Sequence, residues 1–120
     1  MLREDLLHLL NETLTPSLFK DYAPNGLQVE GKTQINHIVT AVTATQNVIV
    51  RACELGADAL LVHHGWFWRG ENPIIVRTKH KRLKAMLMAD MNLIAYHLPL
   101  DAHSTLGNNA QLGALLGAKN

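Results

Sequence analysis

The pattern of apolar and polar positions along the chain predicts four helices. In each of them, apolar residues recur at helical spacing with polar or charged residues between them: residues 2–14, 46–55, 83–91 and 110–116. Pro16 follows the first segment where a helix should end, and Gly56 closes the second. Thr43, with Gln46 three residues later, predicts a capping box at the start of the second helix.

Three continuous apolar runs lie between these helices and predict strands buried on both faces: Ile35–Ala44, Ala57–His63 and Leu93–Leu98. The turn-forming sequence Asp21–Gly26 predicts a structured loop, with a short strand at Leu27–Val29. Helices that alternate with strands in this way predict an α/β fold, with a parallel sheet built from βαβ units and flanking helices. Residues 1–120 should form a single α/β domain. Because this architecture normally returns to the sheet after its last helix, we expect the N-terminal part of a longer protein.

The longest segment outside these elements, Gly65 to Thr78, contains three consecutive aromatic residues, Trp66, Phe67 and Trp68. A loop of this length in a small α/β domain usually has a role. We expect the aromatic residues to line a pocket or to contact another subunit. The alternative is a loop that packs only against its own domain.

Composition and charge exclude several classes of protein. The chain is 48% hydrophobic and 18% charged, which is typical of a folded globular domain. Eleven Lys and Arg against ten Asp and Glu give a net charge of +1, so the overall charge does not favour a nucleic-acid or membrane partner. Without a bilayer-length apolar stretch, and with Glu4 and Asp5 interrupting the N-terminal apolar residues, we expect a cytoplasmic protein.

Histidine is the first indication of chemistry, because seven occur in 120 residues. His63 and His64 come at the carboxyl end of a predicted buried strand, where open α/β sheets place their ligand sites. Adjacent strand side chains point to opposite faces, so two metal ions would suit the pair better than one. The alternative is one core-facing and one exposed histidine with no ligand.

Asp101 follows the next predicted strand, so its carboxylate should emerge at the same edge as His63 and His64. Imidazoles with a carboxylate suit zinc, manganese or iron rather than calcium. His97 has two interpretations: a core histidine that donates to a backbone carbonyl, or a residue that orients Asp101 or another ligand. The remaining histidines are expected to be solvated: His8, His37, His80 and His103.

One basic cluster occupies residues 77–84, around the expected start of the third helix. Positive charge opposes the helix dipole there, which indicates a compensating anion such as a phosphate-bearing substrate. A solvated face or a subunit contact is the favoured alternative. Neither a phosphate-cradling glycine motif nor a Walker pattern supports nucleotide binding.

Three motifs occur in the order found in one known family: Asp21–Val29, His63-His64-Gly65 and His97–Asp101. Over essentially all 120 residues the sequence resembles the Nif-three-like family, also called GTP cyclohydrolase 1 type 2 homologues, and its bacterial YbgI-like members in particular. The resemblance implies the first half of the Nif-three-like fold. It also implies a dinuclear metal centre, in which His63, His64 and Asp101 are ligands and the two histidines serve different ions.

The same resemblance implies that this chain holds an incomplete site, since family members take further ligands from a His-x-x-x-Glu helix that is absent here. It implies a toroidal homohexamer built from dimers. It suggests a metal-dependent hydrolase of the GTP cyclohydrolase type, with two divalent ions (Zn, Mn or Fe) and a phosphate-bearing or pterin-like small molecule as substrate. The alternative is a non-catalytic, metal-stabilised ring scaffold that binds protein or nucleic acid.

Overall fold

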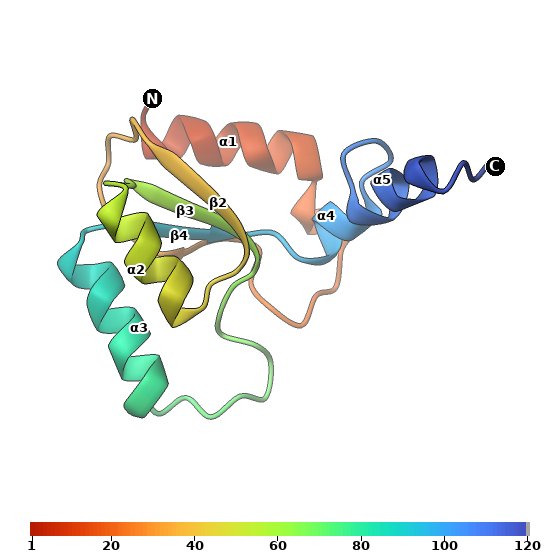
Figure 1. Ribbon diagram of the computed structural model, residues 1–120. Helices are drawn as coiled ribbons and strands as arrows, with labels where there is room; N and C mark the ends of the chain where they lie inside the picture. Colours follow the sequence, from red (N-terminus) through yellow and green to blue (C-terminus); the bar gives the residue numbers. More distant parts are fainter. Residues whose placement is uncertain (120) are drawn as a thin grey trace.

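The computed structural model describes residues 1–119 and contains a four-stranded sheet with helices on both faces (Figure 1). The helices and strands, in chain order, are α1 (Arg3–Leu14), the 3-10 helix η1 (Pro16–Leu18), β1 (Gly26–Val29), β2 (Ile38–Thr43), α2 (Gln46–Glu54), β3 (Ala59–His64), α3 (Arg77–Met88), β4 (Asn92–Ala95), α4 (Leu98–Ala102) and α5 (Asn108–Leu115). The predicted α/β class is confirmed.

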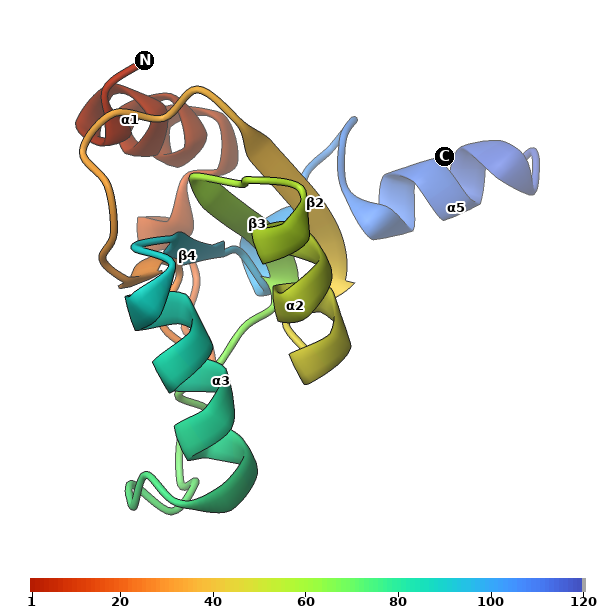
Figure 2. The same cartoon turned by 60° about the vertical axis from the view of Figure 1, so that its left-hand side comes forward.

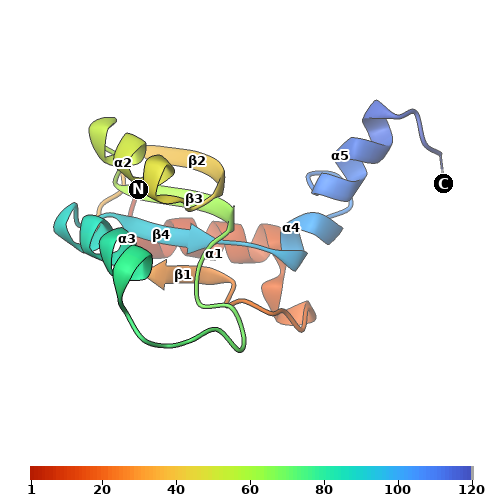
Figure 3. The ribbon, with the colours of Figure 1, turned by 60° about the horizontal axis from the view of Figure 1, so that its bottom comes forward.

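The strand order is β1-β4-β3-β2, and the sheet is mostly parallel. β2 pairs with β3 and β3 pairs with β4 in parallel, through crossovers that contain α2 and α3. β1 pairs with β4 in the antiparallel sense and makes the sheet mixed, as the opposed arrows of Figure 3 show. Both β3 and β4 are central, so their carboxyl ends lie side by side at one edge of the sheet.

The side chains of β3 alternate between two apolar layers. Leu60 and Val62 pack in the layer covered by α2 and α3, whereas Ala59 and Leu61 face α1 on the other side. Figure 2 shows α2 and α3 side by side on one face and α1 on the opposite face. With both faces covered, the strand reads as a continuous apolar run in the sequence.

Two strand predictions were wrong in part. β2 is an edge strand rather than a strand buried on both faces, and Val42 on it is 68% exposed. The run Leu93–Leu98 was predicted as strand throughout, but β4 ends at Ala95 and α4 starts at Leu98. Pro99 in the first turn of α4 favours this early helix start.

The ends of two helices also differ from the sequence prediction. The N-cap of α2 is Thr45, whose hydroxyl accepts a hydrogen bond from the Val48 amide, and not Thr43. The basic segment starts α3 at Arg77, several residues before the apolar stripe begins.

The carboxyl-terminal helices extend away from the sheet. Figures 1 and 3 show α4 beside the end of β4 and α5 projecting from the body of the domain. The apolar residues of α5 are exposed, with Leu115 at 85%. Among residues 1–119, the model contains no helix with the length and apolar character needed to cross a membrane.

Candidate metal centre

Three histidine rings meet where β3 and β4 end. His63 and His64 are the last residues of β3, and His97 lies just beyond β4. Each ring offers one nitrogen, and the three nitrogens all lie within 4.8 Å of one another. The ring centroids of His63 and His64 are only 4.4 Å apart. Adjacent side chains of a regular strand point to opposite faces of the sheet, so the backbone departs from that pattern at the end of β3. This triad is able to hold a metal ion.

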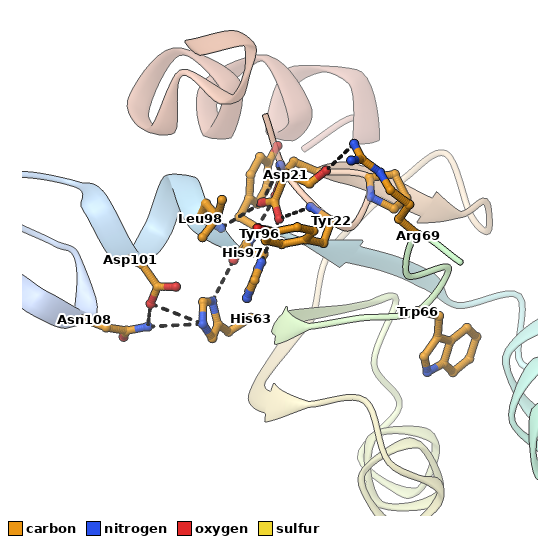
Figure 4. Close-up of polar contacts among 12 residues, drawn as sticks. Asp21, Tyr22, His63, Trp66, Arg69, Tyr96, His97, Leu98, Asp101 and Asn108 are labelled. Atoms are coloured by element: carbon orange, nitrogen blue, oxygen red, sulfur yellow. Dashed lines mark hydrogen bonds and ion pairs between the residues drawn. The ribbon is translucent and has the colours of Figure 1, made fainter. Parts of the chain in front are cut away.

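The protonation of His63 follows from its hydrogen bonds (Figure 4). Its Nδ1 lies 3.0 Å from the carbonyl oxygen of Tyr96, which only accepts, so Nδ1 carries the proton of the neutral ring. The Nε2 of His63 then has a free lone pair, and it faces Asp101 Oδ1 at 3.3 Å. Two acceptors at this distance need a proton or a cation between them.

Asp101 is held in place by α4 and by the start of α5. The side-chain amide of Asn108 donates to Asp101 Oδ1 at 2.9 Å and lies 3.5 Å from His63 Nε2. Gly107 allows this approach, because a Cβ atom there would collide with the backbone carbonyl of Leu100. The loop that leads into α5 therefore positions a donor beside the carboxylate.

His97 is oriented by a buried carboxylate. The side chain of Asp21 is only 3% exposed, and its Oδ1 lies 2.8 Å from His97 Nδ1. Asp21 also accepts hydrogen bonds from the backbone amides of Leu98 and Tyr22 and from the side chain of Asn25. The side-chain oxygen of Asn25, Oδ1, in turn accepts a hydrogen bond from the backbone amide of His97. These bonds leave His97 with Nδ1 protonated and Nε2 free, on the side of the other two histidines.

Burial alone would raise the pKa of Asp21, but the hydrogen bonds that it accepts reverse the effect. The bonds from His97, the Leu98 amide, Asn25 and the Tyr22 amide lower its pKa to about 2. The carboxylate is therefore ionised at neutral pH and stabilises a proton on His97 Nδ1.

His64 is the member of the triad that lies beside Thr43 and Trp68. Its Nδ1 is 3.3 Å from the Thr43 hydroxyl, and its ring is 6.0 Å from the Trp68 ring. Burial lowers the pKa of His64, and the nearby His63 and His97 lower it further, against an opposing effect of Asp101. A lowered pKa keeps the imidazole neutral, which is the form that binds metals.

The structure brings together the residues that the sequence placed at this edge. His63, His64 and Asp101 lie at one end of the sheet, as predicted. The histidine group has a third member, His97, and Asp101 contacts His63 among these three histidines. Their role as metal ligands stays a prediction. The partner of His97 Nδ1 is a carboxylate rather than the backbone carbonyl of the first interpretation, and a role of His97 in orienting Asp101 or another ligand stays a prediction.

Sequence reasoning assigned no role to two residues of this site. Asp21 was noted in a turn-forming sequence and in the family motif Asp21–Val29, without a role of its own, and it lies 76 residues from the histidine that it orients. Asn108 follows Gly107 at the start of α5, where an asparagine has many ordinary uses. The signal available for Asp21 was its position at the start of the motif Asp21–Val29.

The aromatic segment borders the site. Trp66 donates its Nε1 hydrogen to the carbonyl of Ala44 at 3.0 Å and packs against the core. Trp68 meets His97 edge-on, with 4.9 Å between ring centroids. Phe67 is 39% exposed. Trp66 and Trp68 line a cavity, which agrees with the prediction that the aromatic residues line a pocket. Their contact with another subunit stays a prediction.

Comparison with known proteins places this chain beside a defined group. The model of the Duf34/NIF3 (NGG1p interacting factor 3) family matches residues 1–120. A GTP cyclohydrolase 1 type 2 homolog from Escherichia coli is 57% identical over 117 residues, which are 98% of this chain and 47% of that relative. The chain thus spans about half the length of the curated relatives it matches.

Two solved structures share the fold described above. The protein ybgI, described as of unknown function, superposes with a TM-score of 0.95 at 57% identity, over 98% of this chain and 47% of that one. A protein from Thermus thermophilus superposes with a TM-score of 0.91 at 42% identity, over 98% of this chain and 48% of that one.

Proposed function

Since the chain belongs to the Duf34/NIF3 family, we propose that its strand-end histidines and Asp101 bind divalent metal ions and that the protein is a metal-dependent hydrolase. One observation carries the metal assignment: His63, His64 and His97 each offer a ring nitrogen within 4.8 Å of the other two, and Asp101 Oδ1 lies 3.3 Å from His63 Nε2. A proton on Nε2 would satisfy the His63–Asp101 pair alone, but a cation would use all four groups at once.

The donor set fits a borderline divalent ion such as zinc, manganese or iron. It consists of three imidazoles and one carboxylate, the ligands that these ions prefer over the all-oxygen sets of calcium. We propose two ions, with His63 and His64 serving different ones. Four protein donors are few for two ions, so water, substrate or another polypeptide segment would complete their coordination.

When bound, such ions polarise the bond under attack and lower the pKa of a coordinated water. The residues around them have supporting roles. The Tyr96 carbonyl fixes the tautomer of His63, Asp21 fixes that of His97, and Asn108 donates to Asp101. Histidine ligands are commonly oriented by such second hydrogen bonds.

The name of the Escherichia coli relative, GTP cyclohydrolase 1 type 2 homolog, guides the choice of substrate. We propose a phosphate-bearing or pterin-like small molecule. The net charge of +1 gives no support to nucleic acid.

The test has two parts, metal content and turnover. Elemental analysis of the purified protein should find zinc, manganese or iron, and His64→Ala should lose most of it. His103→Ala is the matched control, because His103 lies outside the triad. The metal-loaded protein is then screened for turnover against nucleotides and pterins. Stoichiometric metal in His64→Ala would contradict the ligand set, and metal without turnover would leave a binding protein.

A second candidate function, assembly into a ring scaffold, has its own supporting observation. Apolar side chains of α5 and of the residues on either side of it are exposed: Leu106, Leu112, Leu115 and Leu116. Exposed apolar surface of this kind favours burial against another polypeptide. We propose self-association, with the toroidal hexamer built from dimers as the expected form. Light scattering coupled to size exclusion measures the mass directly, and a monomer at all concentrations would rule assembly out.

A further inference from the structure

A second candidate site lies beside the strand-end histidines. An open cavity of about 270 Å³ is formed between the segment after β3 and the first turns of α3, and its lining residues are Gly65, Trp66, Trp68, Glu71, Thr78, Lys79 and Arg82. Figures 1 and 2 show this connection passing from the end of β3 to the start of α3. The volume is below the ~300–1,000 Å³ of whole small-molecule sites, so the cavity suits one part of a ligand.

Arg82 is the unusual residue of this cavity. It stands one helical turn before Met86, which is fully buried, so it occupies the core-facing side of α3. Its Nε is buried and has no hydrogen-bond partner among residues 1–119. A buried donor without a partner costs free energy, so such a group is expected to meet an acceptor in the working protein.

The other charges of the cavity do not neutralise Arg82. Lys79 is already engaged, since its Nζ donates to the Asn72 carbonyl at 2.6 Å and lies 3.7 Å from a Glu71 carboxylate oxygen. The Glu71 carboxylate is thus directed to Lys79, which leaves the positive charge of Arg82 uncompensated. The site therefore favours an oxyanion.

The start of α3 adds donors to the same cavity. The helix has no side-chain cap at its N-terminus, and no acidic residue stands in its first turn. Thr78 lines the cavity one helical turn before Arg82, so the two residues lie on the same face of α3. The first turn of a helix also has backbone amides without an intrahelical partner, and these adjoin Thr78. An anion here would meet the helix dipole and Arg82 together.

Trp68 connects this cavity with the candidate metal centre. Its ring lines the cavity and also lies 4.9 Å from the His97 ring and 6.0 Å from the His64 ring. Gly65, which follows His64 directly, lines the cavity as well. A molecule seated at Arg82 would therefore have its remainder beside the histidines.

We propose that this cavity is an oxyanion-binding subsite, in which Arg82 and the first turn of α3 bind a phosphate or carboxylate group of the substrate. Oxyanion binding rests only on the cavity residues. The further step, that the reacting part of the same molecule lies at the metal centre, rests on the proposed function.

The two tryptophans of the chain both line the cavity, so tryptophan fluorescence reports ligand binding at this site; because Trp68 also lies beside His97 and His64, variants are needed to separate the cavity from the histidines. Metal-free protein is titrated with inorganic pyrophosphate and, separately, with acetate, at constant ionic strength. Saturable change with pyrophosphate identifies a phosphate subsite, and saturable change with acetate alone identifies a carboxylate subsite. No saturable change with either probe overturns the proposal.

Variants separate a specific site from general electrostatic attraction. Arg82→Ala should weaken probe binding by about tenfold or more, the loss expected for a charge-assisted contact. Lys81→Ala removes the same charge from an exposed neighbouring position and should leave the affinity within about twofold. Equal losses in the two variants, or no loss in Arg82→Ala, would contradict the assignment.

His64→Ala distinguishes this proposal from the metal proposal. The variant should lose metal but keep the fluorescence response to the probe, whereas Arg82→Ala should keep metal and lose the response. If His64→Ala loses metal but the wild type shows no probe response, the subsite proposal fails and the metal proposal stands. If the wild type responds to the probe but never binds metal, the metal proposal fails and the subsite proposal stands.

Discussion

Asp21 and His97 form a buried carboxylate–imidazole pair, with Asp21 Oδ1 2.8 Å from His97 Nδ1. The two residues come from a loop before the first strand and from the segment after the last one, 76 positions apart. This pair fixes the side of the His97 ring that faces His63 and His64. It ties the geometry of the histidine triad to the loop that contains Asp21.

Asp21→Asn should therefore weaken metal binding without removing a ligand. An amide cannot stabilise the Nδ1 proton of His97 as a carboxylate does, and changes to such orienting partners commonly cost about 10–100-fold in metal affinity. Calorimetric titration with zinc or manganese measures the effect. Asp5→Asn, at an exposed acidic residue of α1, is the control. Equal affinity in wild type and Asp21→Asn would show that the pair has no influence on the centre.

Asp21 should also make the fold sensitive to acid. Its pKa is lowered to about 2 from 3.8, so its contribution is fully present above about pH 4 and is lost as the pH falls towards 2. A shift of this size corresponds to about 2 kcal/mol of unfolding free energy. Urea denaturation of metal-free protein at several pH values should show wild type and Asp21→Asn converging between pH 4 and 2. A constant difference across that range would contradict the assignment.

The strands were predictable where burial on both faces produces a continuous run of apolar residues in the sequence. β3 is covered on both faces, so its continuous apolar run identified it and its end at the histidines. β2 is rich in β-branched residues, which occur in buried and edge strands alike, so its composition did not reveal that it lies at the sheet edge. The end of β4 was missed because Tyr96 and Leu98, which follow it, suit a strand equally well.

The site was predictable only as far as strand ends determine it. His63, His64 and Asp101 follow neighbouring parallel strands, so topology alone brings them to one edge. The histidines of the site are oriented by long-range hydrogen bonds that no sequence spacing encodes: His63 donates to the Tyr96 carbonyl, and His97 donates to the Asp21 carboxylate. The buried, unpartnered Nε of Arg82 was equally invisible within a run of basic residues.

Asp101→Ala should remove metal and keep the fold. The side chain is 28% exposed and contacts His63 and Asn108 rather than the apolar core, so its loss should change the unfolding free energy by less than about 1 kcal/mol. Asp101 is a proposed direct ligand, so its removal should lower the metal affinity by at least roughly 100-fold, the upper value for residues that only orient a ligand. Elemental analysis and circular dichroism test the two statements, and unchanged metal content would refute the ligand role.

Thr45→Ala tests the corrected start of α2. The Thr45 hydroxyl accepts a hydrogen bond from the Val48 amide at 3.3 Å, and its loss should cost about 1 kcal/mol of unfolding free energy. Thr43→Ala removes a hydroxyl that is not the cap and should cost less. Urea denaturation compares the two variants. A larger loss for Thr43→Ala would restore the capping box predicted from the sequence.

Gly65→Ala should disturb the strand end more than any ordinary surface substitution. A Cβ atom at this position would collide with the Gln28 side chain and come within 2.7 Å of the Ala95 Cβ atom. Gln28 accepts the Trp66 amide at 2.7 Å and donates to the Trp66 carbonyl at 3.1 Å, so its displacement would free both backbone groups. We expect a loss of about 1–3 kcal/mol in unfolding free energy, as for other overpacked positions.

The same substitution should weaken metal binding, because Gly65 follows His64 directly and Trp66 anchors the segment that passes the histidines. Gly70→Ala is a suitable comparison: Gly70 has a φ of 82°, which strains any side chain, but a Cβ atom there meets nothing within 4 Å. Both variants should lose stability, whereas the metal affinity should fall in Gly65→Ala alone. Unfolding by urea and titration with zinc separate the two effects. Equal metal affinity in the two variants would show that the histidines tolerate movement of the strand end.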